Sequence, residues 1–195
     1  MSKDLRVVLE KIDYEITDLH FRWGVYRDVF AQGPEQIALL NRNGSNFFHI
    51  TQLLMIDYMT LAFSKLTDPS KQGKNENLSL KQLHVLLEEI GEAEVIEELN
   101  MRFEVLYRSC EKFRELRNKR VAHSDMRHAL ELAEEPLPGI SRAYIEEALV
   151  NLRDYINVVN RKFKGTTVLY QEFVEDLYGR SENLIRALNR SEASA

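Results

Sequence analysis

The residues of this chain most suggestive of chemistry are an arginine at the end of an apolar helical stripe and a histidine six positions later. The stripe recurs at steps of three and four residues, the period of one helix face, in Leu99, Phe103, Leu106, Cys110 and Phe113. Arg117 continues this face, where a cation costs free energy unless it is paired or opens onto a cleft. An arginine, the polar Asn118 and His123 close together could bind and cleave a phosphodiester.

Each of these side chains has a chemical role in such a reaction. A positioned imidazole transfers protons near neutral pH and contributes about 10²–10⁴ to a rate. Arginine stays charged and offers a fork of donors that matches phosphate oxygens. Asn118 could donate to a phosphate oxygen or orient the histidine. We therefore take Arg117, Asn118 and His123 as candidate catalytic residues.

Helical geometry sets a condition on this site. In a regular helix, six residues place His123 about 120° around the axis from Arg117. The two side chains converge only if the helix is distorted near Val121, or if a second chain completes the site. The structural alternative is that Arg117 caps the helix or pairs with Asp125 or a distant acid, and that His123 is a structural histidine at a helix end.

Charge is unevenly distributed along the chain. The net charge is −5, but residues 112–127 hold six cations and two acids and carry +4, which leaves −9 elsewhere. Such a local basic patch favours a focused anion site over a long nucleic-acid groove. Lys119, Arg120 and Arg127 are candidate contacts to an RNA backbone. The alternative is a solvated helix face whose cations balance nearby acids.

The segment 113–125, Phe-Arg-Glu-Leu-Arg-Asn-Lys-Arg-Val-Ala-His-Ser-Asp, resembles the R-x(4–6)-H signature of the HEPN superfamily. The polar residue that typically follows the arginine is Asn118. The segment is most similar to the abortive-infection, AbiU-like branch, as is the spacing of Leu66-Thr67-Asp68 and Asn77-Leu78-Ser79-Leu80. The resemblance covers roughly residues 5–165.

This resemblance implies metal-independent RNA cleavage, often in antiphage or toxin–antitoxin systems. The RNA 2′-hydroxyl acts as the nucleophile, the histidine as general acid or base, and the arginine neutralises charge at phosphorus. Many members work as dimers with facing motifs, and some only bind. The expected partners are therefore RNA, a second copy of this chain and an antitoxin protein. The alternative function is a non-catalytic module that binds nucleotide, RNA or protein.

Two further residues qualify this interpretation. Some HEPN proteins carry His-x-Tyr, whose tyrosine a partner nucleotidyltransferase modifies, but this chain has His123-Ser124-Asp125 and no such tyrosine. Asp125 could instead hydrogen-bond His123 or pair with Arg120. Transphosphorylation requires both a base and an acid, but each chain holds only one motif histidine. A two-fold homodimer with facing motifs would supply two histidines, one for each role.

Helical periodicity without strand-like alternation predicts an all-α chain, an up-and-down bundle of about five or six helices in one domain, residues 1–195. Loops are expected at 70–77 and 136–139, and a frayed tail at 191–195. The expected helices are 5–30, a segment from 34 to 66 interrupted around 41–45, 80–90, 92–121, 142–164 and 168–188. Apolar residues on most faces of 47–66 predict a central helix packed on several sides.

Other features limit the remaining classes of function. No apolar run approaches the ~20 residues of a membrane span, and no signal peptide is visible, so we expect a cytoplasmic protein without membrane contact. The lone Cys110 reads as a small buried hydrophobe. His123, His128, Asp125 and Glu131 form no known metal-ligand spacing, and the sequence holds no cofactor-binding motif. We therefore predict neither a metal site nor a cofactor, and interpret His20, His49 and His84 as surface or core-edge residues.

Overall fold

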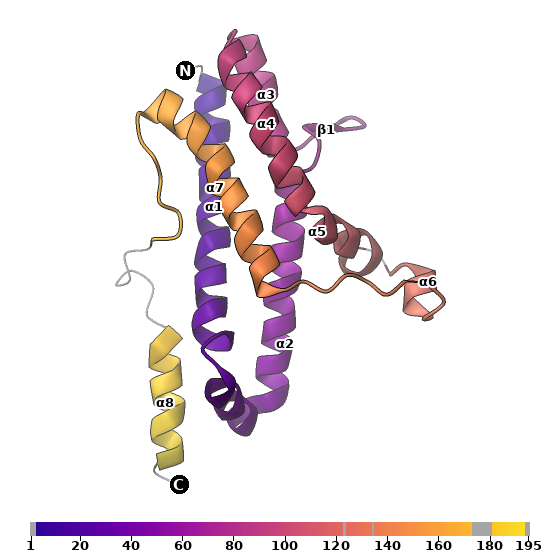
Figure 1. The fold of residues 1–195 in the computed structure, drawn as a ribbon, viewed down its shortest axis with the longest axis vertical. Coiled ribbons are helices and arrows are strands. Elements are labelled where there is room, and N and C mark those ends of the chain that lie inside the picture. The colour runs from indigo at the N-terminus through magenta and orange to yellow at the C-terminus, as the bar shows by residue number, and fades with distance from the viewer. Residues whose placement is uncertain (1–2, 123, 134, 173–180, 194–195) are drawn as a thin grey trace.

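Two long antiparallel helices, α1 (Lys3–Phe30) and α2 (Pro34–Leu66), form the spine of the structure (Figure 1). Helix α3 (Leu80–Glu89) packs on α1 and on α4 (Ala93–Ser109), and α7 (Arg142–Lys164) packs along α4. This computed structural model describes residues 3–122, 124–133, 135–172 and 181–193. Over these ranges the chain is an all-α helical bundle, as the periodicity predicts.

The apolar stripe of α1 forms one wall of the core. Its side chains recur at helical spacing and are buried along the whole helix, which explains why the observed and expected bounds of α1 agree closely. Burying each large apolar side chain contributes roughly 1.5–3 kcal/mol. The buried residues include Leu5, Leu9, Ile12, Ile16, Leu19 and Trp23. None of the helices that the structure describes combines the length and apolarity needed to cross a bilayer.

Helix α2 is kinked where the sequence predicts an interruption. Gly44 leaves helical geometry, with φ 171° and ψ 56°. The expectation that the second half is packed on several sides is only partly correct. Phe63 and Leu66 are buried, but Phe47 and Leu54 are 66% and 64% exposed. Figure 1 shows the reason, because α2 extends beyond the ends of α4 and α7.

The expected helix over 92–121 is divided into three elements. After α4, Cys110 leaves helical geometry, and α5 (Glu111–Leu116) turns away from α4 before a π-helical turn, η1 (Arg117–Val121). The new direction is held by Phe113, which stacks on Phe63 of α2 with ring centroids 4.6 Å apart. Cys110 is fully buried as expected, and burial raises the pKa of its thiol to about 12.

The polar stretch expected as a loop after α2 contains a small hairpin. Strands β1 (Lys71–Gln72) and β2 (Asn75–Glu76) pair antiparallel. Asn77 closes its base, because its backbone N–H donates to the carbonyl of Ser70 at 2.8 Å and its side chain to that of Pro69 at 2.9 Å. The hairpin is therefore ordered by polar contacts at its base.

The C-terminal region differs from the helix expected over 168–188. Residues 168–172 are not helical, because Asn157 of α7 pairs through its side chain with both backbone groups of Val168, at 2.8 and 3.1 Å. Helix α8 (Ser181–Ala193) follows, and most of the expected frayed tail belongs to it. Its Glu192 accepts hydrogen bonds from Arg42 and Asn43 of α2, which fixes the end of the helix.

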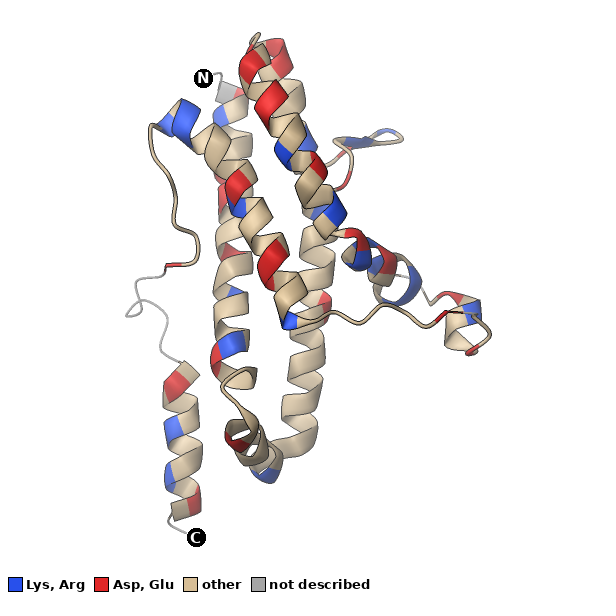
Figure 2. Ribbon diagram, viewed as in Figure 1, with Lys and Arg blue, Asp and Glu red and all other residues tan. Residues whose placement is uncertain are grey.

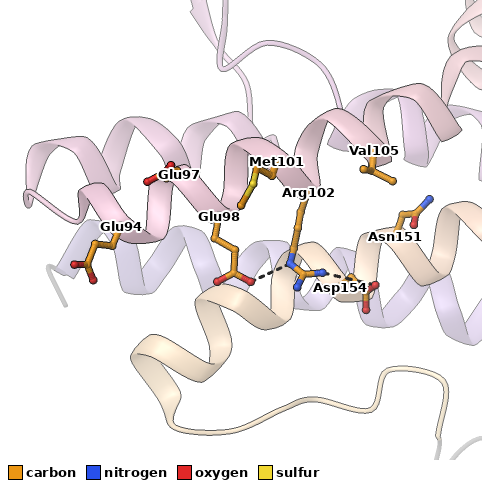
Figure 3. Close-up of a pocket in the computed structure, with 8 residues that line it drawn as sticks. All are labelled: Glu94, Glu97, Glu98, Met101, Arg102, Val105, Asn151 and Asp154. Carbon is orange, nitrogen blue, oxygen red and sulfur yellow. Dashed lines mark hydrogen bonds and ion pairs between the residues drawn. The ribbon is translucent and has the colours of Figure 1, made fainter.

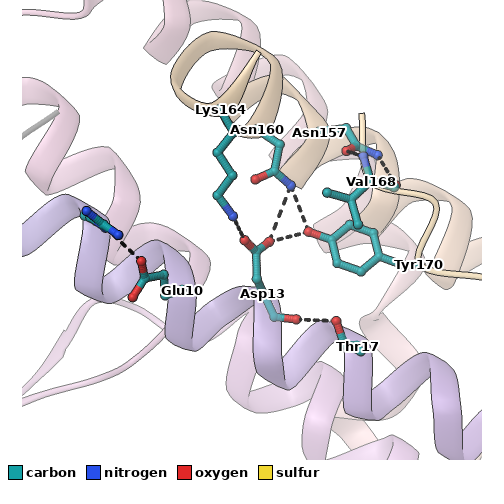
Figure 4. Close-up of polar contacts among 9 residues, drawn as sticks. Glu10, Asp13, Thr17, Asn157, Asn160, Lys164, Val168 and Tyr170 are labelled. Carbon is teal, nitrogen blue, oxygen red and sulfur yellow. Dashed lines mark hydrogen bonds and ion pairs between the residues drawn. The ribbon is translucent and has the colours of Figure 1, made fainter. Parts of the chain in front are cut away.

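A polar cluster around Asp13 joins α1, α7 and the segment after α7 (Figure 4). The Asp13 carboxylate accepts hydrogen bonds from the Tyr170 hydroxyl, from the Lys164 ammonium and from the Asn160 amide. Tyr170 is buried, and burial together with the neighbouring carboxylate raises the pKa of its hydroxyl. This cluster holds residues 168–172 against the bundle.

We expect Tyr170→Phe to lower the free energy of unfolding by about 1–2 kcal/mol, because it removes a buried hydrogen bond to a charged group. For a chain of this size, the melting temperature should fall by about 2–8 °C in thermal unfolding. Tyr14→Phe, at an exposed position of α1, is the matched control and should change little. Equal melting temperatures for the two variants would contradict the assigned role of the cluster.

Candidate functional site

Arg117 stands at the junction of α5 and η1, close to the end of α2. Its guanidinium donates a hydrogen bond to the carboxylate of Asp68 at 2.8 Å, and its Nε donates to the side chain of Asn118 at 3.0 Å. The side chains of Arg117 and Asp68 are only 24% and 20% exposed. The cation that ends the apolar stripe is therefore paired with a distant acid, one of the alternatives that the sequence leaves open, while part of it still meets solvent.

The helix is distorted where convergence of the motif requires it. The backbone N–H of Ala122 donates to the carbonyl of Arg117 at 2.8 Å, five residues back rather than four. Beyond η1, the backbone N–H of Asp125 donates to the carbonyl of Lys119 at 3.0 Å, a six-residue span that belongs to neither an α-helix nor a π-helix. The condition of a distortion near Val121 is thus met. His123 itself lies outside the described residues, so the distance from Arg117 to the imidazole remains a prediction.

Two of the three candidate RNA contacts are already paired with acids. The ammonium of Lys119 lies 2.9 Å from Glu115, and the guanidinium of Arg120 lies 2.5 Å from Asp57 of α2. Arg127 is exposed on α6 (Met126–Ala129) and has no ion pair with a residue that the structure describes. We therefore rank Arg127 as the cation of this set most available to an incoming phosphate.

Helix α2 and the turn after it supply the two carboxylates that sequence reasoning missed as parts of the site. Segment 112–127 alone carries +4. When the two carboxylates paired with it, Asp57 and Asp68, are counted as well, the sum is +2. For Asp68 a signal was present, since it lies in the spacing that resembles the AbiU-like branch. Asp57 has no such signal, because its contact with η1 joins residues that are 63 positions apart.

Asp125 has a local role. Its carboxylate accepts hydrogen bonds from the backbone N–H of His128 at 3.1 Å and from the Nδ1 of the same residue at 2.8 Å, and so caps α6. These bonds lower the pKa of Asp125. Pairing of Asp125 with Arg120 or with Arg117 is wrong, because these arginines bind Asp57 and Asp68 instead. The other role, a hydrogen bond to His123, falls on a residue outside the described ranges.

Two hollows lined by described residues bear on the motif. A groove of about 540 Å³ lies between α4 and α7, and Figure 3 shows Arg102 within it, flanked by Glu98 and Asp154. It holds four carboxylates and one guanidinium, so it would repel a phosphate. A smaller hollow of about 140 Å³ includes Asp68 and is therefore adjacent to the partner of Arg117.

The other histidines do not form a second site. His20 and His84 are buried in the bundle, and burial lowers the pKa of each to about 4. His20 donates from Nδ1 to the carbonyl of Ile16 at 2.9 Å, so it is a neutral structural residue near pH 7. His49 is exposed on α2. Over the described ranges, no three His, Cys, Asp or Glu side chains are grouped so that they could hold a metal ion.

A family model described as AbiU2, of the HEPN superfamily, matches residues 2–184. The chain belongs to this family. The match includes the motif-bearing region, Asp57 of α2, Asp68 in the turn after α2, and all of α7, and it extends beyond residues 5–165 at both ends. Comparisons with curated proteins and with solved structures give no match.

We expect Asp68→Asn to lower the free energy of unfolding by about 1–2 kcal/mol, because it leaves the partly buried Arg117 without a counter-charge. Asp57→Asn is the matched control, since the pair that it breaks is more exposed and should contribute at most about 1 kcal/mol. Urea unfolding of both variants measures the difference. A larger effect for Asp57→Asn than for Asp68→Asn would contradict the view that Arg117 is anchored by Asp68.

Proposed function

We propose that this AbiU2-family protein is a metal-independent endoribonuclease in which Arg117 and His123 are the principal catalytic groups and Asn118 assists. The observation that carries the proposal is the pairing of Arg117 with Asp68 at the start of a π-helical turn, in a chain of the HEPN superfamily. The pair holds the guanidinium in place, and its partial exposure leaves donors for a phosphate oxygen.

The proposed reaction is a transphosphorylation within the RNA. The 2′-hydroxyl loses its proton to a base and attacks phosphorus, while the 5′-oxygen leaves with a proton from an acid. Arg117 neutralises charge on the phosphoryl oxygens. The products are a 2′,3′-cyclic phosphate and a 5′-hydroxyl. Asn118 accepts a hydrogen bond from Arg117 through its Oδ1, so its amide N–H groups stay available to the phosphate or to His123.

We further propose that two copies of the chain form the working enzyme. Segment 44–56 of α2 contains no Asp, Glu, Lys or Arg, and Figure 2 shows this half of the helix without charge. Its outer face is formed by the exposed side chains of Phe47, Ile50, Leu53 and Leu54. Exposed apolar faces of this kind mark protein interfaces.

The apolar face of segment 44–56 lies next to the motif. This position favours a second copy of the chain as the protein that covers the face. Asp57 lies one turn beyond Leu53 and pairs with Arg120 of η1. A two-fold contact through this part of α2 would therefore bring the motif of each chain beside that of its partner and supply the second histidine. Within the proposal, the protein acts in antiphage defence or as a toxin that an antitoxin protein restrains.

We expect the purified protein to cleave end-labelled RNA in the presence of EDTA and to leave 2′,3′-cyclic phosphate ends. His123→Ala should lower the rate by about 10²–10⁴, because it removes the proton-transfer group. Arg117→Ala should lower the rate by about 10²–10³, because it removes charge stabilisation at phosphorus. Gel analysis of the products measures both effects.

The controls separate this function from that of a binding module. Lys11→Ala changes an exposed side chain on α1, away from the motif and from the apolar face of α2, and should retain full activity. Cleavage that depends on added metal, or that survives His123→Ala, contradicts the proposed mechanism. RNA binding that persists in His123→Ala, falls in Arg117→Ala and never leads to cleavage identifies a non-catalytic HEPN module, a function consistent with the acid partners already bound by Arg117 and Arg120.

We expect Leu54→Glu to convert the dimer to a monomer, because the substitution places a charge in the apolar face. Sedimentation velocity measures the molecular mass. Met101→Glu is the matched control, since Met101 and Leu54 are both 64% exposed but Met101 lies on α4. A monomeric wild-type protein would overturn the dimer, and a dimeric Leu54→Glu would overturn this face as its interface.

A further inference from the structure

The hairpin of β1 and β2 is an ordered projection without an apolar contact surface of its own. All six residues from Lys71 to Glu76 are exposed, and each strand has only two residues. A two-stranded hairpin is marginally stable in water, so the bonds that Asn77 makes at its base account for its order. An exposed polar element of this kind is suited to contact with another polar molecule.

Its two lysines outnumber its one acid. Lys71 lies opposite Glu76 in the register of the two strands, and residues 71–76 carry a net charge of +1. Lys71 and Lys74 form no ion pair with any residue over the ranges that the structure describes. By contrast, Arg117, Lys119 and Arg120 each have a carboxylate partner within 3 Å. The two hairpin lysines thus resemble Arg127 rather than the anchored cations, and their ammonium groups are free to bind an anion.

The hairpin is tied to the motif through Asp68. This residue binds Arg117 at 2.8 Å and precedes Lys71 by three positions, so the two backbone positions are at most ~10–11 Å apart. The hairpin, with two lysines and one glutamate, projects on the side of the bundle that also carries α5 (Figure 2). An RNA phosphate held by Arg117 therefore has neighbours on the same strand within reach of the hairpin.

We propose that Lys71 and Lys74 form a second binding site for the RNA backbone, which holds nucleotides that flank the cleaved bond. This inference rests on the proposed ribonuclease function and extends it. The site binds phosphates through point charges on flexible stems, so it positions single-stranded RNA without reading its sequence. It also explains why the substrate can be held although Lys119 and Arg120 are paired with acids.

The test is the salt dependence of binding to a fluorescein-labelled single-stranded RNA, measured by anisotropy in the His123→Ala background so that the probe is not cut. Lys71→Ala with Lys74→Ala should reduce the slope of log K against log salt by about 1.4, since each lost contact to a single strand contributes about 0.7. The loss of affinity should then be about sevenfold larger at ~0.05 M than at ~0.2 M salt.

Matched variants control for net charge and for folding. Lys11→Ala with Lys162→Ala removes the same charge from α1 and α7 and should keep the original slope. Lys71→Arg with Lys74→Arg should also keep it, because the charge is preserved. Thermal unfolding of each variant verifies that the bundle is intact.

The outcomes separate the two proposals. A slope unchanged in Lys71→Ala/Lys74→Ala, in a protein that binds and cleaves RNA, overturns the hairpin site and leaves the ribonuclease standing. A reduced slope in the lysine variant and an unchanged slope in both controls supports the hairpin site. A protein that neither binds nor cleaves RNA overturns the ribonuclease, and the hairpin site with it.

Discussion

The arrangement of the motif depends on one ion pair, between the guanidinium of Arg117 and the carboxylate of Asp68. A partly buried cation loses much of its hydration, and only a close counter-charge compensates that loss. Because Asp68 follows the last turn of α2 and Arg117 follows the last turn of α5, the pair fixes the ends of two helices against each other. The apolar stack of Phe113 on Phe63 joins the same two helices from the core side.

This junction turns a patch of basic sequence into a shaped site. Taken alone, segment 112–127 is a run of cations on a helix end, which a helix dipole would favour anyway. Asp57 and Asp68 hold Arg120 and Arg117 in place, so in the proposed nuclease the cations would be positioned before a phosphate binds. These two carboxylates also lower the net charge around the motif. In the proposal, the exposed side chains of Lys71, Lys74 and Arg127 beside the motif supply positive charge in its place. In the proposal, Arg117 and Arg120 thus position the phosphate, while the unpaired hairpin lysines and Arg127 attract the RNA.

The sequence predicted those features that depend on local periodicity and failed where distant contacts decide. The bounds of α1 and α7 follow from apolar spacing and from breakers such as Gly165, whose left-handed conformation ends α7. The break at Cys110 has no Gly or Pro to mark it, because it follows from packing on α2. The same is true of residues 168–172, which Asn157 holds out of helical geometry. Apolar composition predicted a helix over the second half of α2. It could not predict that Phe47 and Leu54 are exposed, because their exposure depends on where the neighbouring helices end.

For the site, residue types and spacing singled out Arg117 and the need for a distortion near Val121, since both are properties of one helix. Its acidic partners come from α2 and the turn after it, 49 and 63 positions away along the chain, and no local pattern reveals such pairs. Family likeness supplied part of this information, because it marked Asp68 before its partner was known.

The π-helical turn has a consequence for how the motif tolerates changes in length. A bond across five residues encloses one residue more than the ordinary helical bond, so η1 already holds a surplus position between Arg117 and Ala122. Deleting that position would tighten the turn into a regular one, while Arg117 would stay anchored from the α5 side. Arg117 is therefore held by Asp68 and α5 whatever the length of the segment after it, whereas the direction of that segment depends on the surplus position.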